Sequence, residues 1–314
     1  MAHNAIRGID GRRPFPSLEE PMSDMMMARS KAGVRARAVT PVIGAEIEID
    51  LREPLDQSTV EAIRTAWYEN TILLFRNQSL SEENQVRFGE YFGVLSKVLN
   101  KRKSSQAHHP SVMFISNIRE NGELIGALPD GEVYFHSDHC FTASPPAGTM
   151  LYAMEIPRAG GNTIFANMYA AYDALPQEVK DRLENLRALN VYDLAGAPAI
   201  RMDSIPPNAQ SHVHPVVKVH PVSGRKALYV NRLMTYNIEG LSAAENQDLL
   251  HYLFDHQEQK RFHYEHVWRP GDLIIWDNRC TLHARTNFDA QERRLLRRIV
   301  LLTDHGPQPS AYKH

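Results

Sequence analysis

The chain has 314 residues, 43% hydrophobic and 23% charged, which is the composition of an ordinary globular protein. Its formal net charge of -2 excludes the broad basic field that attracts nucleic acid, so we expect a small-molecule partner. Two cysteines are too few for a disulfide scaffold and indicate a reducing, cytoplasmic setting, and no apolar run approaches the roughly 20 residues that span a membrane.

The first 38 residues show no apolar periodicity, and we expect residues 1–38 to form a flexible or loosely docked tail. No linker rich in Pro, Gly or Ser divides the remainder, so residues 39–314 are predicted to form a single domain. Near its start, Ile47, Ile49 and Leu51 alternate with acidic residues, which is typical of a half-buried strand.

Helices and strands then alternate. The pattern predicts a helix over about 59–70 and a buried strand over 71–75. Ser81 is placed as the N-cap of a second helix, and Pro176 as the start of a third.

The second half of the chain is dominated by short β segments separated by turn signals. They cover residues 216–219, 227–230, 272–276 and 295–302. Irregular strands with a few helices on one side favour a mixed β fold with flanking helices around a β-sandwich or jelly-roll core.

Three side chains distant in sequence suggest a metal centre. In a strand, His136 and Asp138 would project from one face while Ser137 and His139 project from the other, and a lone His283 follows far downstream. Two His and one carboxylate are the ligands of non-heme Fe(II) oxygenases. A chain with 15 histidines and 37 acids also produces such pairs by chance, so a purely structural pair remains the alternative.

Two arginines strengthen the functional interpretation. Strand alternation after residue 293 places Arg294 and Arg298 on one face and Arg293 and Arg297 on the other. A buried guanidinium needs an anion, because an unpaired buried charge is costly. A dicarboxylate would satisfy one of them.

From about residue 40 to the C-terminus, ordered sequence blocks resemble the Fe(II)/2-oxoglutarate-dependent dioxygenases of the taurine dioxygenase and chlorophenoxyacetate dioxygenase group. The blocks are His136-Ser137-Asp138, Pro145-Pro146-Ala147-Gly148, Gly160-Gly161-Asn162-Thr163, His214-Pro215-Val216-Val217, Gly224 to Asn231, Trp276-Asp277-Asn278-Arg279 with His283, and Arg294 with Arg298. The resemblance implies a double-stranded β-helix, or jelly-roll, core.

The resemblance also implies roles for six residues. It assigns Fe(II) to His136, Asp138 and His283, the co-substrate 2-oxoglutarate to Thr163 and Arg294, and the acidic group of the substrate to Arg298. It implies that O2 and 2-oxoglutarate are consumed, that the substrate is hydroxylated, and that succinate and CO2 are released.

Two departures bear on the substrate. Residues 96–100 contain no His where the taurine enzyme has a substrate-contacting one, and Phe135 stands where Trp commonly precedes the first ligand. We therefore expect an aryloxyalkanoate-like carboxylate, with an alkylsulfonate or another small acid as the alternative. A jelly-roll protein with a purely structural metal and a zinc hydrolase with the same three ligands are the rival classes.

Other candidate ligands are assigned structural roles. His214 and His220 each precede a proline and lack a neighbouring carboxylate, so we interpret them as turn or core histidines. Cys140 and Cys280 are interpreted as buried thiols. Beyond the small acidic substrate, the expected partner is another copy of the chain, as a homo-oligomer, with no nucleic acid and no membrane.

Overall fold

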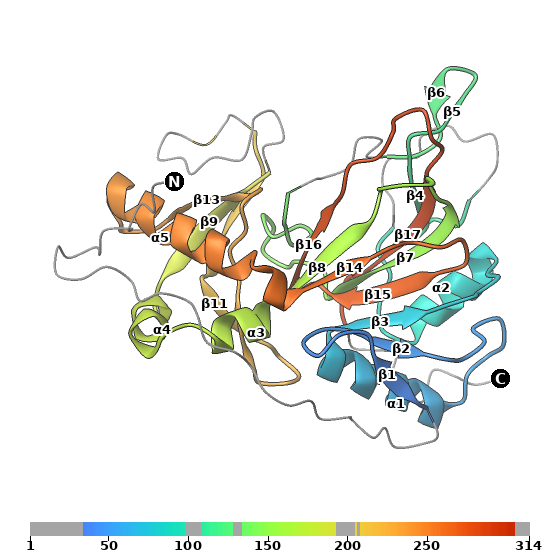
Figure 1. Ribbon diagram of the computed structural model, residues 1–314, viewed down its shortest axis with the longest axis horizontal. Helices are drawn as coiled ribbons and strands as arrows, with labels where there is room; N and C mark the ends of the chain where they lie inside the picture. Colours follow the sequence, from blue (N-terminus) through green and yellow to red (C-terminus); the bar gives the residue numbers. More distant parts are fainter. Residues whose placement is uncertain (1–33, 98–107, 128–133, 193–204, 206–207, 305–314) are drawn as a thin grey trace.

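The computed structural model describes residues 34–97, 108–127, 134–192, 205 and 208–304. These residues form a mostly β structure with few helices (Figure 1). None of the described helices is long and apolar enough to cross a membrane.

The largest sheet has seven strands. In spatial order they are β1 (Ala36–Ala38), β2 (Ala45–Ile47), β3 (Ile72–Phe75), β15 (Leu273–Asp277), β7 (Gly148–Glu155), β17 (Leu295–Leu301) and β4 (Met113–Ser116). β2 and β3 pair in parallel, and the other neighbouring strands in this sheet are antiparallel.

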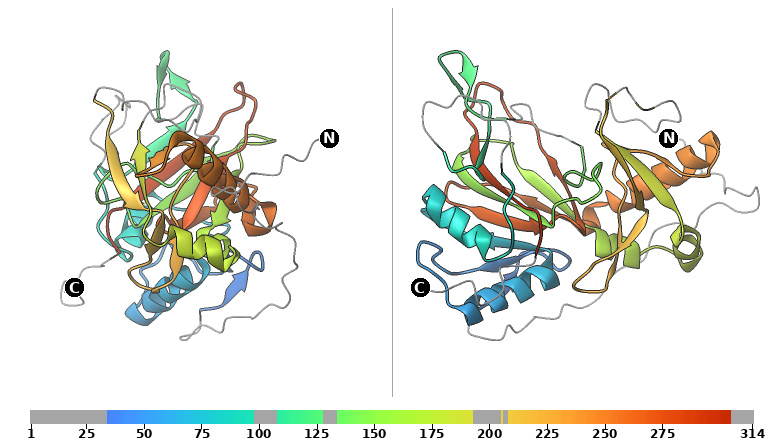
Figure 2. Two further views of the ribbon diagram at one scale, coloured as in Figure 1. Left: turned by 90° about the vertical axis from the view of Figure 1, so that its left-hand side faces the viewer. Right: turned by 180° about the vertical axis from the view of Figure 1, so that it is seen from behind.

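Both faces of the central strands are buried. Leu73 and Phe75 of β3 pack on one face against α1 (Gln57–Asn70) and α2 (Glu82–Glu90), which cover the outside of the sheet (Figure 2, right). Ile72 and Leu74 pack on the other face. This double burial explains the uninterrupted apolar sequence of β3, because a strand covered on one side only would alternate.

A smaller antiparallel sheet faces the inner side of the large one. Its strands are β14 (His263–His266), β8 (Thr163–Asn167) and β16 (Thr281–Arg285), in that order. Phe165 of β8 packs against Trp276 of β15, with ring centroids 5.4 Å apart. The space between these two sheets contains the side chains discussed below.

The remaining elements pack around a separate apolar cluster beside the two sheets (Figure 1, left). They are α3 (Met168–Asp173), α4 (Gln177–Leu183), α5 (Ala243–Gln257) and the 3-10 turn Lys260–Phe262, with the strands β9 (Arg187–Val191), β10 (Ser211–Pro215), β11 (Val217–Val219), β12 (Lys226–Leu228) and β13 (Thr235–Ile238). A small hairpin, β5 (Arg119–Glu120) and β6 (Glu123–Leu124), projects from the other end.

Two sequence expectations need correction. The strand predicted to continue through Leu51 ends at Ile47, because the side chain of Gln78 bonds the backbone of Ile49 and Leu51 in place of a neighbouring strand. Residues 1–33 of the expected tail lie outside the described residues, but Ala36–Ala38 form the edge strand β1. Three residues are too short to show a readable alternation.

Candidate active site

His136 and His283 lie directly opposite each other in an isolated antiparallel bridge. Each donates its backbone N–H to the carbonyl of the other, at 3.0 and 2.9 Å. Opposed residues in such a bridge project their side chains to the same side. The two rings accordingly stand with centroids 4.1 Å apart, and the ring of His283 packs beside Trp276 of the large sheet.

Asp138 completes a compact triad between the sheets. Its Oδ1 lies 4.0 Å from Nε2 of His136 and 3.9 Å from Nε2 of His283. One ligand atom from each of the three residues lies within 4.8 Å of the others. The three predicted metal ligands, 145 residues apart from Asp138 to His283, are thus brought together.

The donor set fits a ferrous ion. Imidazole nitrogens suit iron, and two of them with one carboxylate make up the facial set of non-heme Fe(II) sites. Nδ1 of His136 lies 2.9 Å from the carbonyl of Tyr134. A proton on Nδ1 therefore donates to that carbonyl and leaves the Nε2 lone pair directed at the triad, which is how metal-binding histidines are usually oriented.

The expectation that His136 and Asp138 project from the same face of one strand is wrong. Only His136 makes a β bridge, and the chain turns immediately after it, with His139 at a positive φ of 52°. His139 is exposed and its ring stacks on Phe141.

Asn278 anchors this turn, although the sequence suggested no role for it. Its side-chain oxygen accepts from the backbone N–H of Asp138 at 2.7 Å, and its Nδ2 donates to the carbonyls of Asp138 and Pro146 at 2.9 and 3.0 Å. No local pattern could have revealed these bonds, because Asn278 lies 140 residues from Asp138.

The electrostatics of Asp138 favour an ionised carboxylate. Burial by itself would raise the pKa of Asp138, but the nearby charge of Arg298 and the imidazoles of His283 and His136 outweigh it and hold the pKa well below its usual range. Nη2 of Arg298 lies 2.6 Å from Oδ2 of Asp138. Arg298, the residue expected to bind the acidic group of the substrate, therefore forms an ion pair with a member of the triad.

Arg294 is buried, and no acidic residue in the described part of the chain pairs with it. It is 5% exposed, no acceptor among the described residues bonds its Nε, and its guanidinium lies 5.8 Å from the centre of the Phe288 ring. Burial, and secondly the charge of Arg285, lower the pKa of Arg294 to about 9. Such a cation is stabilised by any anion that enters beside it.

Thr163 begins β8 two residues beyond Gly161, against which Arg294 packs. A Cβ built on Gly161 would lie 3.2 Å from Nε of Arg294. The hydroxyl oxygen of Thr163 accepts a hydrogen bond from the indole N–H of Trp268 at 3.0 Å. Its hydroxyl proton makes no bond among the described residues, so Thr163 can still donate to a bound carboxylate.

His214 and His220 make hydrogen bonds away from His136, Asp138 and His283. Nε2 of His214 lies 2.9 Å from the carbonyl of Thr142, and burial lowers the pKa of His214 to about 4. Nδ1 of His220 accepts from two backbone N–H groups, at Val222 and Ser223, so its proton is on Nε2 and is donated to Asp277 at 2.9 Å.

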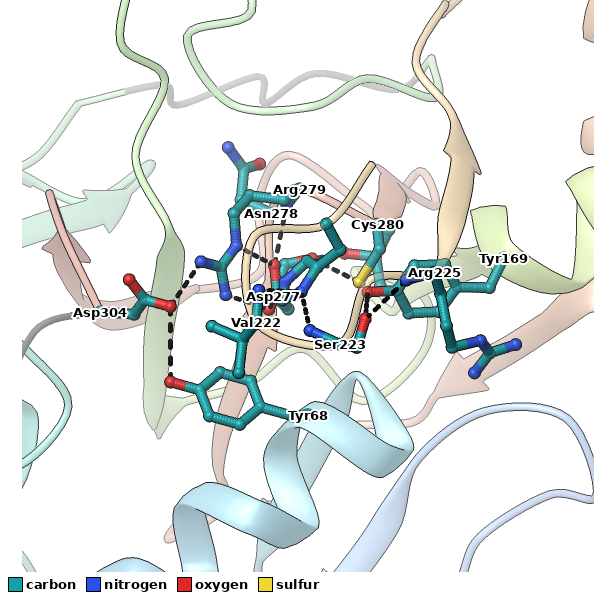
Figure 3. Close-up of polar contacts among 12 residues, drawn as sticks. Tyr68, Tyr169, Val222, Ser223, Arg225, Asp277, Asn278, Arg279, Cys280 and Asp304 are labelled. Atoms are coloured by element: carbon teal, nitrogen blue, oxygen red, sulfur yellow. Dashed lines mark hydrogen bonds and ion pairs between the residues drawn. The ribbon is translucent and has the colours of Figure 1, made fainter. Parts of the chain in front are cut away.

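Asp277, His220 and Cys280 form a second cluster of metal-ligand residue types, but hydrogen bonds already occupy it (Figure 3). Both carboxylate oxygens of Asp277 accept from the Arg279 side chain, at 2.9 and 2.5 Å. Burial raises the pKa of Cys280 well above its ordinary value. A thiol that stays protonated, next to a carboxylate whose charge is balanced by an arginine, indicates a structural cluster and not a metal site.

Residues 35–300 match the family model described as taurine catabolism dioxygenase TauD, TfdA family. The chain is 37% identical to an alpha-ketoglutarate-dependent 2,4-dichlorophenoxyacetate dioxygenase of Cupriavidus pinatubonensis (strain JMP 134 / LMG 1197), over 86% of this chain and 98% of that protein. It is 31% identical to an alpha-ketoglutarate-dependent sulfate ester dioxygenase of Pseudomonas putida, over 82% of this chain and 86% of that protein.

Solved structures with a similar fold include the following two. A protein called AAD-2, in complex with Mn(II) and N-oxalylglycine, is 26% identical and superposes with a TM-score of 0.74 over 88% of this chain and all of that one (100%). A structure described as a putative alpha-ketoglutarate-dependent taurine dioxygenase from Burkholderia xenovorans is 29% identical, with a TM-score of 0.73 over 88% of this chain and 96% of that one.

Proposed function

Since the chain belongs to the taurine catabolism dioxygenase TauD, TfdA family, we propose that it is an Fe(II)- and 2-oxoglutarate-dependent dioxygenase that hydroxylates a small acidic organic substrate. Succinate and CO2 are the accompanying products. The three ligands we propose for Fe(II) are His136, Asp138 and His283.

The observation that carries this function is a buried arginine, Arg294, that no described carboxylate neutralises, together with a cluster of three metal-binding residue types. Among the described residues no carboxylate pairs with Arg294, whereas Arg279 and Arg298 each pair with a carboxylate at 2.5 to 2.6 Å. A structural metal or a zinc hydrolase needs no such anion site. The planar guanidinium suits the distal carboxylate of 2-oxoglutarate, to which it can donate two parallel hydrogen bonds.

The protein's own contribution is binding, orientation and exclusion of water. Bound Fe(II) would supply the activation of O2 that accompanies decarboxylation of 2-oxoglutarate. Arg294 and the hydroxyl of Thr163 would hold the co-substrate in one orientation, and Trp276 and Phe165 wall the ring of His283 from solvent.

For the substrate we propose an aryloxyalkanoate-like carboxylate, held by Arg298. Support comes from the relatives whose names specify 2,4-dichlorophenoxyacetate and (S)-phenoxypropionate. Arg298 is 11% exposed at its side chain and stands next to Asp138, where a substrate acid would be close to the metal. A sulfate ester is the second candidate, because the Pseudomonas putida relative is named for one.

The finer architecture is part of the proposal. We assign the chain from β1 (Ala36–Ala38) onward to a single domain with a jelly-roll core, which the facing of the seven-stranded and three-stranded sheets supports. A cytoplasmic location and a homo-oligomeric state complete the proposal. The two cysteines, both free and buried, fit a reducing setting.

A titration of 2-oxoglutarate into the Fe(II)-loaded protein without oxygen tests the function. We expect a weak visible charge-transfer band, which a zinc hydrolase or a structural metal would not give. Arg294→Gln should weaken 2-oxoglutarate binding by about 30-fold or more, the usual effect of deleting one partner of a buried charged pair.

Arg297→Gln is the matched control. Arg297 is equally buried, at 4% exposed, but donates to the backbone carbonyl of Leu80. We expect its 2-oxoglutarate affinity to stay within about twofold of the natural protein's, since no charged pair with the ligand is lost. Unchanged affinity in Arg294→Gln, or equal loss in both variants, would contradict the assignment.

A further inference from the structure

The carboxylate of Asp138 has two oxygens in different surroundings. Oδ1 faces both imidazoles, at 4.0 and 3.9 Å from their Nε2 atoms. Oδ2 faces away and accepts a hydrogen bond from the hydroxyl of Thr149 at 2.7 Å, besides its contact with Arg298. A carboxylate whose second oxygen is engaged in this way is restrained from rotating or from binding an ion through both oxygens.

We propose that Thr149 is a positioning residue that presents Asp138 to the metal through Oδ1 alone, and that Asn278 performs the same task on the backbone of Asp138. This inference rests on the proposed metal site. It assigns to two residues outside the ligand set the role of positioning a metal ligand.

The position of Thr149 is well suited to the role. It is the second residue of β7, a central strand of the large sheet, and is 0% exposed. Backbone pairing with Trp276 on one side and Val300 on the other fixes its place. Its hydroxyl therefore approaches Asp138 from a rigid strand, whereas Asp138 itself lies in a turn.

Thr149 and Arg298 both contact Oδ2 of Asp138, and only Arg298 is proposed to bind the substrate. Under the proposed function, the acid of the substrate binds Arg298, the other group on Oδ2. The substrate anion then competes with Asp138 for that guanidinium. Because the proposed substrate site involves Arg298 and not Thr149, we expect the bond from Thr149 to keep Oδ2 engaged whether or not substrate is bound.

Asn278 compensates for the absence of a strand around Asp138. Asp138 lies in a turn and pairs with none of the described strands, and the residue after it has a positive φ. The side-chain amide of Asn278 bonds both the backbone N–H and the carbonyl of Asp138. Asn278 also accepts from the hydroxyl of Ser137 at 3.2 Å. Asn278 lies in the turn between β15 and β16, and His283 is the third residue of β16. The same turn therefore precedes the third ligand and anchors the loop that carries Asp138.

Hydrogen bonds of the neighbouring Arg279 hold the turn between β15 and β16 in place. Figure 3 shows Asn278 between Asp277 and Arg279, and Arg279 joins Asp277 to Asp304. The side chain of Asn278 therefore projects from an immobilised support. A metal-binding loop that lacks regular secondary structure gains its geometry from this rigid neighbour.

Mn(II) binding to the whole chain in the absence of 2-oxoglutarate and substrate tests the proposal without relying on turnover. Titration calorimetry or electron paramagnetic resonance of free Mn(II) gives the affinity. Thr149→Val keeps the shape and removes the hydroxyl, and we expect a loss of about 10- to 100-fold in affinity, the usual effect of removing a group that orients a ligand. Thr149→Ser should restore binding to within a few-fold.

Thr281→Val is the matched control. Thr281 is 1% exposed and also donates at 2.7 Å, but to the main-chain carbonyl of Asp277. We expect Mn(II) affinity within about twofold of the natural protein's, because no metal ligand loses an orienting bond. Thr149→Ala, which removes the hydroxyl without adding bulk, should behave like Thr149→Val and covers the case that the valine variant does not fold.

Asn278→Ala should weaken Mn(II) binding by a similar factor, because the carboxylate loop loses its anchor. Full Mn(II) affinity in the folded Thr149→Val and Thr149→Ala proteins, or an equal loss in Thr281→Val, would overturn the inference. If the natural protein bound no Mn(II) at the triad, the proposed function itself would fail, so the two failures are distinguishable.

Discussion

His136 and His214 are both buried imidazoles, at 2% and 5% exposed, and only their surroundings separate their roles. His136 donates through Nδ1 and directs Nε2 at the triad. His214 uses Nε2 to bond the carbonyl of Thr142 and lies near the ammonium group of Lys218. The two histidines differ in what Nε2 faces: the carboxylate of Asp138 for His136, and a backbone carbonyl for His214.

The environment of His214 predicts how stability depends on pH. Burial, and secondly Lys218, lower the pKa of His214 in the folded state to about 4, from the 6.5 of an exposed histidine. Between these values the unfolded chain binds a proton that the folded chain does not. The free energy of unfolding therefore falls as pH decreases from about 6.5 to 4.

His214→Gln removes this titration while keeping a donor for Thr142. We expect a shallower loss of stability across that window, measured by urea unfolding at several pH values. His256, His263 and His266 also have lowered pKa values and will leave a residual slope in both proteins. Identical pH slopes in the variant and the natural protein would show that His214 does not contribute.

At the scale of elements, the turn before β8 determines the shape of the co-substrate site. Gly160 and Gly161 both have positive φ, 73° and 67°. A Cβ on Gly160 would lie 2.1 Å from the backbone carbonyl oxygen of Asn287, whereas a Cβ on Gly161 would meet the side chain of Arg294. One glycine allows the turn to pack, and the other leaves room for the guanidinium.

Alanine at the two positions should therefore have different effects. Gly160→Ala forces two backbone segments apart, and we expect a marked fall in thermal unfolding temperature. Gly161→Ala should cost about 1 kcal/mol in stability from its backbone conformation and raise the KM for 2-oxoglutarate by displacing Arg294. An unaltered KM in a folded Gly161→Ala protein would disconnect this turn from the co-substrate.

Local chemistry predicted part of the fold. Ser81 is the N-cap of α2 with a full capping box, and the buried strand over 71–75 is β3, since both depend on neighbours in sequence. The same type of box, Ser242 with Glu245, starts α5, a helix that the sequence interpretation left out although its signal was readable.

The candidate site was predictable to a different degree. Residue types and the family resemblance singled out His136, Asp138, His283 and Arg294, and the structure brings the first three together. Periodicity could not show that Asp138 lies in a turn. The bonds from Thr149 and Asn278 to Asp138 depend on long-range packing, which leaves no trace in local sequence.

At the scale of the whole molecule, one buried ionic network joins segments from both ends of the chain. Arg279 bonds Asp277 and, at 2.6 Å, Asp304, which follows β17. The backbone carbonyl of Asp304 accepts from Arg64 of α1. Tyr68 of the same helix donates to the carboxylate of Asp304 (Figure 3). The turn that carries Asn278 is thus fastened to the helix that covers the outer face of the large sheet.

Removing Arg279 should destabilise the whole fold. Arg279→Gln leaves the buried Asp277 and Asp304 without their shared cation, and we expect a loss of about 3–5 kcal/mol in the free energy of unfolding. Adding Asp304→Asn removes one of the two carboxylates that lose Arg279 and should recover part of the loss. Urea unfolding of the single and double variants measures both effects, and a single variant as stable as the natural protein would refute the network's role.

The central claim is that His136, Asp138 and His283 together bind one metal ion. Calorimetric titration of Mn(II) into the natural protein, His283→Ala and Cys280→Ala tests it most directly, because Cys280 belongs to the second cluster, whose ligand atoms are already bonded. We predict one ion per chain in the natural protein and in Cys280→Ala, and no measurable binding in His283→Ala. Retained binding in His283→Ala with loss in Cys280→Ala would contradict the account.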